Sequence, residues 1–472
     1  MDEYEVVIGL EVHVELLTES KMFCSCSTKF GSSPNTNVCP VCTGMPGVLP
    51  VINEKAIELA IKTGIAFNSN ISKNCRFARK NYFYPDLPKN YQISQYEQPI
   101  IKGGYIKIGE KKINLTRIHL EEDAGKLIHS EEGVFSYVDF NRSGIPLLEI
   151  VTEPDIRSPE EAELFLLKLK QNLEYLGISD CNMEEGSLRC DANISVRKRG
   201  EKKLGVKVEV KNMNSFKAVR KALSYEAKRQ ISVLRKGEKV IQQTRLWNEK
   251  QQRTEVMRTK EEAHDYRYFP EPDLLPVEIN DDFIKRVERE IGELPEERRE
   301  RIKREYNLPD YDIDVLMSEK IIIDYFEECA KTFKNYKMIS NWIMGEIMAL
   351  VKEEKEINIF EKISPEKFAG LLNMVEKGKI TATVGKEVLK EIFKTGKLPD
   401  EIVKEKNLLQ IDDESFIEKV VREVIEENPE AVDDYRKGKE KVIGFLIGQV
   451  MKKMKGKANP SVVKNTFEKI LK

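Results

Sequence analysis

The segment Tyr4-Glu-Val-Val-Ile-Gly-Leu-Glu-Val-His-Val-Glu-Leu-Leu17 alternates apolar and polar residues with a period of two. This alternation predicts a β-strand with one buried face, because successive side chains of a strand point to opposite sides. The opposite face would present Glu11, His13 and Glu15 in a row. Neighbouring carboxylates repel each other unless a cation lies between them, so this row indicates half of a metal-assisted site. The side chains that would face the core are Leu10, Val12, Val14 and Leu16.

Four later segments repeat this design, with aliphatic residues on one side and acids, amides or lysines on the other. Any one such strand is more often ordinary protein surface. The recurrence of acids beside a histidine favours a basin lined with carboxylates, and Mg²⁺ is the cation that such oxygen ligands suit. Strands with one polar face favour an antiparallel sheet. The segments are Leu120-Glu-Glu-Asp-Ala-Gly-Lys126, Leu147-Leu-Glu-Ile-Val-Thr-Glu-Pro154, Cys190-Asp-Ala-Asn-Ile-Ser-Val196 and Gly205-Val-Lys-Val-Glu-Val-Lys211.

Two helices are predicted to cover the apolar side of this sheet. Ser158-Pro159-Glu160-Glu161 combines a capping serine, a proline and two acids, which predicts a helix over 159–176. Ser215 similarly predicts a helix over 215–236. The chain contains neither a GxxxxGK[ST] nor a GxGxxG motif. If a nucleotide binds, we therefore expect the acidic sheet and its lysines to hold it.

Four cysteines form the pattern Cys24-Ser-Cys26, twelve intervening residues, and Cys39-Pro-Val-Cys42. Two close pairs within a short, loop-rich segment have the spacing of a tetrahedral zinc site. Four protein ligands leave no open position, so we expect a structural zinc that helps to fold residues 20–50. The alternatives are a redox pair and unrelated free thiols.

Two segments interleave aromatic and basic residues. Residues 76–92 interleave Lys80 and Lys89 with Tyr82, Phe83, Tyr84 and Tyr91. Asp265-Tyr-Arg-Tyr-Phe-Pro-Glu-Pro-Asp273 is similar in kind. Aromatic rings can stack on bases while lysine and arginine meet phosphate. Each segment alone could equally be core aromatics with polar flanks.

The composition predicts a soluble, cytoplasmic protein with no membrane partner. The chain has 472 residues, 40% hydrophobic and 33% charged, which suits two or three domains. No apolar run reaches the roughly 18 residues that a transmembrane helix needs, and the first 20 residues lack the basic start of a secretory signal. In the cytoplasm, the eight cysteines favour thiols or metal ligands over disulfides.

The charge is unevenly distributed along the chain. Residues 401–430 hold ten acidic and four basic residues, whereas residues 436–472 hold eleven basic and two acidic ones. A basic end on a near-neutral protein suggests a nucleic-acid partner, although a solvated helix face is the alternative. From these changes in composition and charge along the chain we predict three domains. They are a domain over 1–290 with a zinc-binding insertion near 20–50, a helical domain over 291–405, and a basic helical tail over 406–472.

Seven motifs resemble those of the B-subunit family of the bacterial aspartyl/glutamyl-tRNA(Asn/Gln) amidotransferases. The resemblance extends over essentially the whole chain, and the motifs are long enough to be specific. They are Ile8-Gly-Leu-Glu-Val-His-Val-Glu15, Arg79-Lys-Asn-Tyr-Phe-Tyr-Pro-Asp86, Tyr91-Gln-Ile-Ser-Gln95, Leu120-Glu-Glu-Asp-Ala-Gly-Lys126, Glu184-Glu-Gly-Ser-Leu-Arg-Cys-Asp-Ala-Asn-Ile-Ser195, Lys211-Asn-Met-Asn-Ser-Phe216 and Asp265-Tyr-Arg-Tyr-Phe-Pro-Glu-Pro-Asp273.

The resemblance implies an α+β fold and a ligase reaction. The fold would be a mainly antiparallel cradle similar to the catalytic sheet of glutamine synthetase and the guanido kinases, followed by a helical domain and a tRNA-binding tail. The reaction would use ATP to phosphorylate the side-chain carboxylate of mischarged Glu-tRNA(Gln) or Asp-tRNA(Asn). Ammonia from an amidase-family glutaminase, the A-subunit, would then displace phosphate. A small C-subunit would complete a heterotrimer.

The resemblance and the chemistry together give candidate site residues. Mg²⁺ would be held by Glu11, His13, Glu121 or Glu122, Glu149 and Glu209, of which Glu11 and His13 are also catalytic candidates. Nucleotide contacts are expected from Glu149, Glu209 and Lys211. The remaining catalytic candidates are Lys80, Lys89, Lys211 and Asp191, where lysines would face phosphate or the substrate carboxylate.

Two other functions fit part of the sequence. One is a ligase that amidates a free amino acid, as glutamine synthetase does, but a small substrate needs no basic tail. The other is a zinc-containing tRNA-binding scaffold without chemistry of its own. The acidic row argues against a scaffold, because carboxylates repel phosphate unless a metal bridges them.

Overall fold

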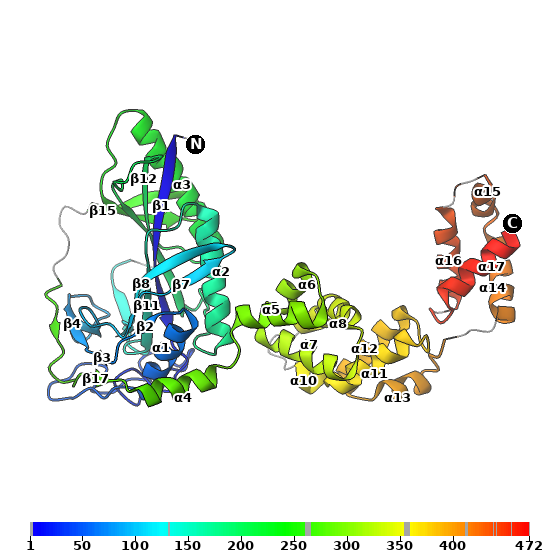
Figure 1. Cartoon of the computed structure of the whole chain (residues 1–472), viewed down its shortest axis with the longest axis horizontal. Coiled ribbons are helices and arrows are strands. Elements are labelled where there is room, and N and C mark those ends of the chain that lie inside the picture. The colour runs from blue at the N-terminus through cyan, green and yellow to red at the C-terminus, as the bar shows by residue number, and fades with distance from the viewer. Residues whose placement is uncertain are drawn as a thin grey trace. The chain divides into compact units, whose positions relative to one another are not determined.

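The structure is a computed structural model that describes residues 3–130, 133–259, 266–353, 359–410, 414–437, 439, 441–454 and 456–471. The chain divides into two compact units, Met1–Pro295 and Glu296–Lys472 (Figure 1). Asp265, the first residue of one aromatic motif, lies outside the described residues. Among the helices of the described residues, none is both long and apolar enough to cross a membrane.

The first unit is built on a sheet of ten described strands. Their order is β15-β14-β13-β12-β1-β11-β8-β6-β2, and β7 also pairs with β8. The strands are β1 (Tyr4–Glu15), β2 (Asn70–Ile71), β6 (Ile101–Lys102), β7 (Tyr105–Ile108), β8 (Lys111–Glu122), β11 (Pro146–Thr152), β12 (Leu188–Lys198), β13 (Val208–Lys211), β14 (Gln243–Asn248) and β15 (Arg253–Thr259).

The sheet is mainly antiparallel, as the sequence predicts, and contains one parallel pair among the described strands. The described pairs are antiparallel except for β13 and β14, which run parallel. Helix α3 (Phe216–Arg235) connects these two strands, and a crossover of this length is what a parallel pair requires. The α+β class is confirmed.

The predicted opening strand is confirmed as β1, at the centre of the sheet. Leu10, Val12, Val14 and Leu16 are buried with at most 3% of their surface exposed. They join one hydrophobic cluster with residues of α1 (Glu54–Ala66), α2 (Pro159–Tyr175) and α3. The helices therefore cover the apolar side of the strands and leave the polar side for a site.

The two helices expected from their caps are also confirmed. Ser158 and Ser215 accept hydrogen bonds from backbone amides of Glu161 and Ala218, respectively, and so satisfy amides that a helix start leaves unpaired. Helix α1 was not expected from the sequence. Its capping residue Asn53 accepts from the amides of the first turn.

Smaller elements complete the first unit. A three-stranded sheet, ordered β16-β4-β5, brings the two aromatic segments together. Helix α4 (Asp281–Ile291) packs beside α1. The remaining strands are β3 (Asn74–Cys75), β4 (Ala78–Asn81), β5 (Tyr91–Ser94), β9 (Lys126–His129), β10 (Ser136–Asp139), β16 (Phe269–Pro270) and β17 (Val277–Glu278).

The described part of the second unit is helical and contains two separate hydrophobic clusters, one within 302–403 and one within 417–471. Helix α5 begins at Pro295, and Pro309, Pro365 and Pro399 stand at helix starts. The domain boundaries near 290 and 405 stay predictions. The helices are α5 (Pro295–Tyr306), α6 (Asp310–Leu316), α7 (Lys320–Thr332), α8 (Tyr336–Trp342), the π-helix η1 (Ile343–Ile347), α9 (Met348–Glu353), α10 (Ile359–Lys362), α11 (Pro365–Glu376), α12 (Ala382–Thr395), α13 (Pro399–Glu405), α14 (Glu414–Glu427), α15 (Pro429–Arg436), α16 (Val442–Lys453) and α17 (Pro460–Leu471).

Candidate active site

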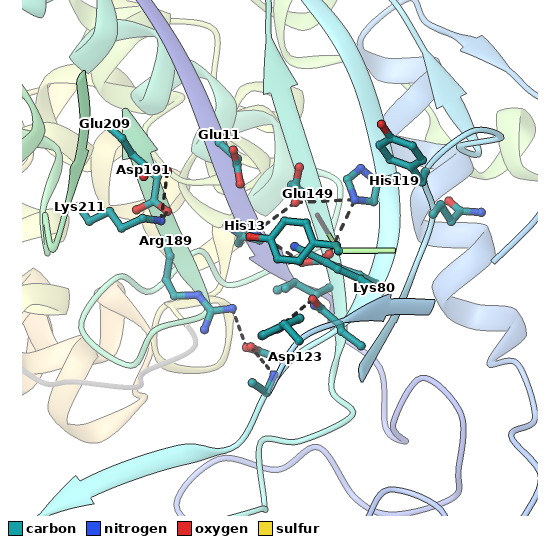
Figure 2. A pocket seen from close by; sticks show the side chains of 18 of the residues that line it. Glu11, His13, Lys80, His119, Asp123, Glu149, Arg189, Asp191, Glu209 and Lys211 are labelled. Atoms are coloured by element: carbon teal, nitrogen blue, oxygen red, sulfur yellow. Dashed lines mark hydrogen bonds and ion pairs between the residues drawn. The ribbon is translucent and has the colours of Figure 1, made fainter. Parts of the chain in front are cut away.

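A cavity of about 740 Å³ lies over the polar side of the large sheet (Figure 2). The strand register explains why acids and histidines meet there. His13 on β1 stands opposite Glu149 on β11, and Glu149 stands opposite His119 on β8. On the other side of β1, Glu11 stands opposite Asp191 on β12. Residues paired across strands point to the same face, so all five side chains share the cavity.

Glu11, His13 and Glu149 form the first cluster, in which one ligand atom from each lies within 4.8 Å of the others. The His13 Nε2 atom is 3.4 Å from a carboxylate oxygen of Glu149 and 3.4 Å from one of Glu121. Burial disfavours a charged imidazole, but the hydrogen bond to Glu149 and the charge of Glu121 raise the pKa of His13 to about 8. Burial and the neighbouring Glu149 raise the pKa of Glu11.

His119, Glu121 and Glu149 form the second cluster, with the same spacing, and Glu149 belongs to both. The His119 Nε2 atom is 3.7 Å from an oxygen of each carboxylate. Burial alone would favour the protonated acids. The hydrogen bond from His119 lowers the pKa of Glu121, and the charge of His119 together with His13 lowers that of Glu149. The two clusters thus concentrate three carboxylates and two imidazoles.

Basic side chains surround these clusters. Lys80 lies in the cavity, where burial opposes its charge but the Glu121 carboxylate raises its pKa. Arg117 Nη2 is 3.4 Å from a Glu149 oxygen, and Arg189 Nη2 is 2.7 Å from Asp123 Oδ2. An anion entering the cavity would therefore meet several cations.

Asp191, Glu209 and Lys211 form the β12–β13 side of the cavity. Lys211 forms an ion pair with Asp191, and its Nζ lies 3.5 Å from a Glu209 oxygen. Thr244 Oγ1 donates a 2.7 Å hydrogen bond to Glu209. These residues line the cavity as expected, but Glu209 belongs to neither of the clusters that the described residues form.

Glu122 and Lys89 do not line this cavity. Glu121 and Glu122 are neighbours on β8, so their side chains point to opposite sides of the strand. Lys89 forms an ion pair with Glu122, which also accepts a 2.9 Å hydrogen bond from the Ile93 amide. The pair lines a second cavity of about 240 Å³ beside Cys42. The structure therefore separates both candidates from the clusters.

Glu15, the third acid of the opening row, also lies apart from the clusters. Burial and the adjacent Asp123 raise the pKa of Glu15 to about 8, because two close carboxyl groups resist double ionisation. Among the described residues, the row therefore contributes Glu11 and His13 to the first cluster, and Glu15 to neither.

Sequence reasoning missed several residues of the cavity. His119 and Arg117 precede Glu121 at intervals of two, and Arg189 precedes Asp191 by two. The same alternation that selected the acids could have selected them, because all lie on one face of their strand. Tyr266 and Tyr268 also line the cavity. The interleaved aromatic and basic residues of their segment indicate a nucleic-acid contact, but only the pairing of β16 with β4 brings the two tyrosines to this cavity.

The four cysteines of the predicted zinc site lie together and form the thiol cluster. Each pair of Sγ atoms is within 4.8 Å, and those of Cys39 and Cys42 are 3.9 Å apart. The hydrogen bond from Cys24, with the charge of nearby Lys21, lowers the pKa of Cys42 to about 4. Cys75, Cys181, Cys190 and Cys329 lie elsewhere and are buried.

Comparison with known proteins identifies the family of this chain. Residues 6–285 match the model of the GatB/GatE catalytic domain, and residues 324–471 match the model of the GatB domain. The aspartyl/glutamyl-tRNA(Asn/Gln) amidotransferase B-subunit of Thermodesulfovibrio yellowstonii is 55% identical over 475 residues, which cover 100% of both chains. The protein of that name from Caldicellulosiruptor saccharolyticus is 56% identical over 470 residues, which cover 98% of both chains. The chain belongs to the GatB family, the B-subunits of the aspartyl/glutamyl-tRNA(Asn/Gln) amidotransferases.

Proposed function

We propose that this chain uses ATP to phosphorylate the side-chain carboxylate of mischarged Glu-tRNA(Gln), Asp-tRNA(Asn) or both, and that ammonia then displaces the phosphate to form the amide. A free carboxylate is a poor acyl donor, and an acyl phosphate divides the difficult substitution into two easier steps. The observation that carries the proposal is the pair of clusters that share Glu149, with Lys80 in the same cavity.

The donor set of both clusters fits Mg²⁺. Both clusters offer mainly carboxylate oxygens, the ligands that hard cations prefer. Within each cluster the ligand atoms lie within 4.8 Å of one another, a distance that one ion can span. The sets are Glu11, His13 and Glu149 in the first cluster and His119, Glu121 and Glu149 in the second. Burial and the charge of Glu149 raise the pKa of Glu11, and a cation bound beside it would favour the ionised carboxylate. Bound Mg²⁺ would supply charge neutralisation for the transferring phosphoryl group. Glu209 would contact the nucleotide and Mg²⁺ from β13.

The chain's own cations would orient the reacting groups. The pKa of Lys80 lies above its usual value, so its ammonium group stays charged and can hold a phosphate or the substrate carboxylate. Lys211 is held by Asp191 and Glu209, whose charges raise its pKa although burial opposes this. Burial and the partly enclosing walls would limit water at an acyl phosphate.

The thiol cluster fits a structural Zn²⁺. Tetrahedral Zn–S bonds of about 2.3 Å place sulfur atoms about 3.8 Å apart, and Cys39 and Cys42 already have this separation. Lys21 Nζ lies 3.6 Å from Cys42 Sγ and would stabilise a thiolate there. Zn²⁺ would fix the loop that carries the four cysteines.

The names of the relatives place them in a multi-subunit enzyme that acts on tRNA. We extend this to a heterotrimer in which an amidase-family A-subunit releases ammonia from glutamine and a small C-subunit completes the assembly. The sheet would serve as a cradle of the glutamine synthetase type. The basic tail after residue 405 would contact the tRNA.

Amide formation by the assembled complex tests this proposal. Purified complex is supplied with ATP, Mg²⁺, glutamine and each mischarged tRNA in turn, and the amino acid recovered from the tRNA is identified by mass spectrometry. We expect glutamine or asparagine on the tRNA and ATP turnover that depends on it. ATP turnover indifferent to the tRNA would overturn the proposal. Membership of the GatB family already disfavours a free amino-acid ligase and a non-catalytic scaffold.

A further inference from the structure

A smaller hollow of about 300 Å³ opens beside the catalytic cavity and shares Tyr96 and Tyr268 with it. The rings of these two tyrosines are stacked, with centroids 4.2 Å apart and an angle of 6° between their planes. Phe269 also lines the hollow, and Tyr96 is 53% exposed. Exposed, parallel aromatic faces of this kind are suited to continue a stack onto a nucleobase.

Charged groups at the same hollow fit the remainder of a nucleotide. Arg76 and Arg267 are exposed and line it, so that phosphates continuing away from a bound base would meet cations. Glu97 and Gln98 are also in its lining and can accept hydrogen bonds from the exocyclic amine of adenine. Stacking faces, acceptors and outward cations therefore occur in one place.

The backbone at this hollow is held in a fixed and unusual conformation. Arg267 has φ of +46°, in the left-handed region that non-glycine residues seldom adopt. Asn81 fixes it, since its Nδ2 donates a 2.8 Å hydrogen bond to the Arg267 carbonyl and its amide donates a 3.0 Å bond to that of Tyr266. Strain maintained by such contacts is typical of binding sites.

A short chain of contacts leads from the hollow to the catalytic groups. The ring of Tyr268 meets that of Tyr266 edge-on at 6.1 Å, and the Lys80 Nζ lies 5.1 Å from the centre of the Tyr266 ring. Lys80 and Glu121 line the same cavity. A group extending inward from the hollow would thus pass Lys80 before it reaches the second cluster.

We propose that this hollow binds the 3′-terminal adenosine of the aminoacyl-tRNA, so that the esterified amino acid extends past Lys80 toward Glu121 and Glu149. The proposal rests on the function proposed above. An RNA end is favoured over ATP because Arg76 and Arg267 are exposed, so that phosphates preceding the terminal base would meet them along the surface of the protein. A triphosphate directed into the catalytic cavity would leave these two arginines unused. Another hollow, which shares Glu11 and Lys207 with the cavity, directly adjoins the first cluster and remains open to ATP.

Steady-state amidation by the assembled complex, with ATP and aminoacyl-tRNA varied separately, tests the assignment. Tyr96→Ala should raise the KM for aminoacyl-tRNA about tenfold, because one base–aromatic stack is lost. The KM for ATP should stay unchanged. Tyr96→Phe keeps the stacking face and should behave like the parent. Tyr311→Ala removes a similarly exposed tyrosine from α6 and serves as the matched control.

A binding measurement separates this assignment from the proposed function. The probe is 3′-deoxyadenosine that carries glutamate through a 3′-amide, which resists hydrolysis, and its Kd is measured by equilibrium dialysis. Tyr96→Ala should weaken probe binding about tenfold, whether or not the complex forms the amide. If Tyr96→Ala instead raises the KM for ATP, the hollow belongs to the nucleotide and the assignment is overturned. Unchanged probe affinity overturns it as well, whereas a parent complex that binds the probe but forms no amide contradicts only the proposed function.

Discussion

His13 belongs to the first cluster and also contacts the second, because its Nε2 lies 3.4 Å from Glu121 and from Glu149. We expect His13→Ala to lower kcat/KM for amidation about 100-fold or more, since loss of a ligand should cost at least as much as loss of a group that supports one. Half-saturation in Mg²⁺ should shift to higher concentration. His129→Ala, at an exposed histidine of β9, is the control. Parent-like Mg²⁺ dependence of His13→Ala would refute the cluster as the cation site.

Glu121 and Glu122 are adjacent in sequence but should have opposite mutational effects. Glu121→Gln should abolish amidation with little effect on unfolding, because its carboxylate faces the cavity. Glu122→Gln leaves the buried Lys89 without its partner, and we expect the first unit to lose about 3–5 kcal/mol of stability. Denaturant unfolding measures the stability of both variants, and the amidation assay measures their activity.

The double variant Lys89→Met/Glu122→Leu controls for the ion pair, because removing both charges should restore most of that stability. If Glu122→Gln unfolds like the parent, the Lys89–Glu122 ion pair contributes little to the stability of the first unit. Loss of amidation in the stable double variant would mean that Lys89 and Glu122 act in the reaction in spite of their position outside the cavity.

Alternation along single strands was sufficient to predict that Glu11, His13, Glu149, Asp191 and Glu209 share a face. It could not decide between Glu121 and Glu122, because the phase of β8 is set by its pairing with β11. It also could not exclude Lys89, whose direction depends on the buried partner that only the fold supplies. The aromatic segments were ambiguous for the same reason, because β16 is distant from β4 in sequence but pairs with it in space.

At the scale of elements, α2 illustrates how the sheet's apolar side is closed. Leu169 is fully buried under the sheet, whereas Leu167 on the same helix is 50% exposed. We expect Leu169→Ala to destabilise the first unit by about 2–5 kcal/mol, through lost burial and the cavity left behind. Leu167→Ala should change stability by less than about 0.5 kcal/mol. Equal shifts of the denaturation midpoint would show that α2 does not pack as described.

Capping residues made α2 and α3 predictable, because their signals are local. The parallel pair β13–β14 was not predictable, because the sequence of neither strand specifies the strand with which it pairs. The resulting mixed sheet places Thr244 of β14 against Glu209 of β13, with a 2.7 Å hydrogen bond that orients this carboxylate. The parallel pair β13–β14, which the sequence did not indicate, therefore helps to position the candidate site residue Glu209.

The cysteine loop offers a test at the same scale. Cys39→Ser removes one thiol of the thiol cluster, and we expect loss of one equivalent of zinc per chain by elemental analysis. Cys329→Ala, at a buried thiol of α7, should leave the zinc content unchanged. A parent protein without zinc after metal-supplemented purification would argue for free thiols. Chelation should destabilise the segment near 20–50, which limited proteolysis would detect as new cleavage there.

For the whole molecule, the proposed catalytic cavity and the basic segment lie in different units. The cavity lies in the first unit, and the basic residues of 436–472 lie in the second. The final hydrophobic cluster packs α14 with α16 and α17, so that the lysines of this segment are carried by a folded element. Under the proposed function, the second unit would contact tRNA phosphates and the first unit would carry the reaction.

Removing residues 406–472 should consequently weaken tRNA binding without disturbing the chemistry of the cavity. We expect the Kd for aminoacyl-tRNA to rise and the slope of log Kd against log salt concentration to become shallower by about 0.7–0.9 for each lost phosphate contact. Fluorescence anisotropy at several salt concentrations measures both. Lys441→Gln and Lys452→Gln, at exposed lysines, should reproduce part of the change in slope with the fold intact.

Activity at saturating tRNA separates recognition by the tail from a structural contribution. If the tail acts only in binding, kcat of the truncated chain in the complex should stay close to the parent value, because Glu11, His13, Glu121 and Glu149 all lie in the first unit. An unchanged Kd at low and at high salt would refute binding through the basic residues. A shallower slope with a lower kcat would instead show that the tail also positions the aminoacyl end for reaction.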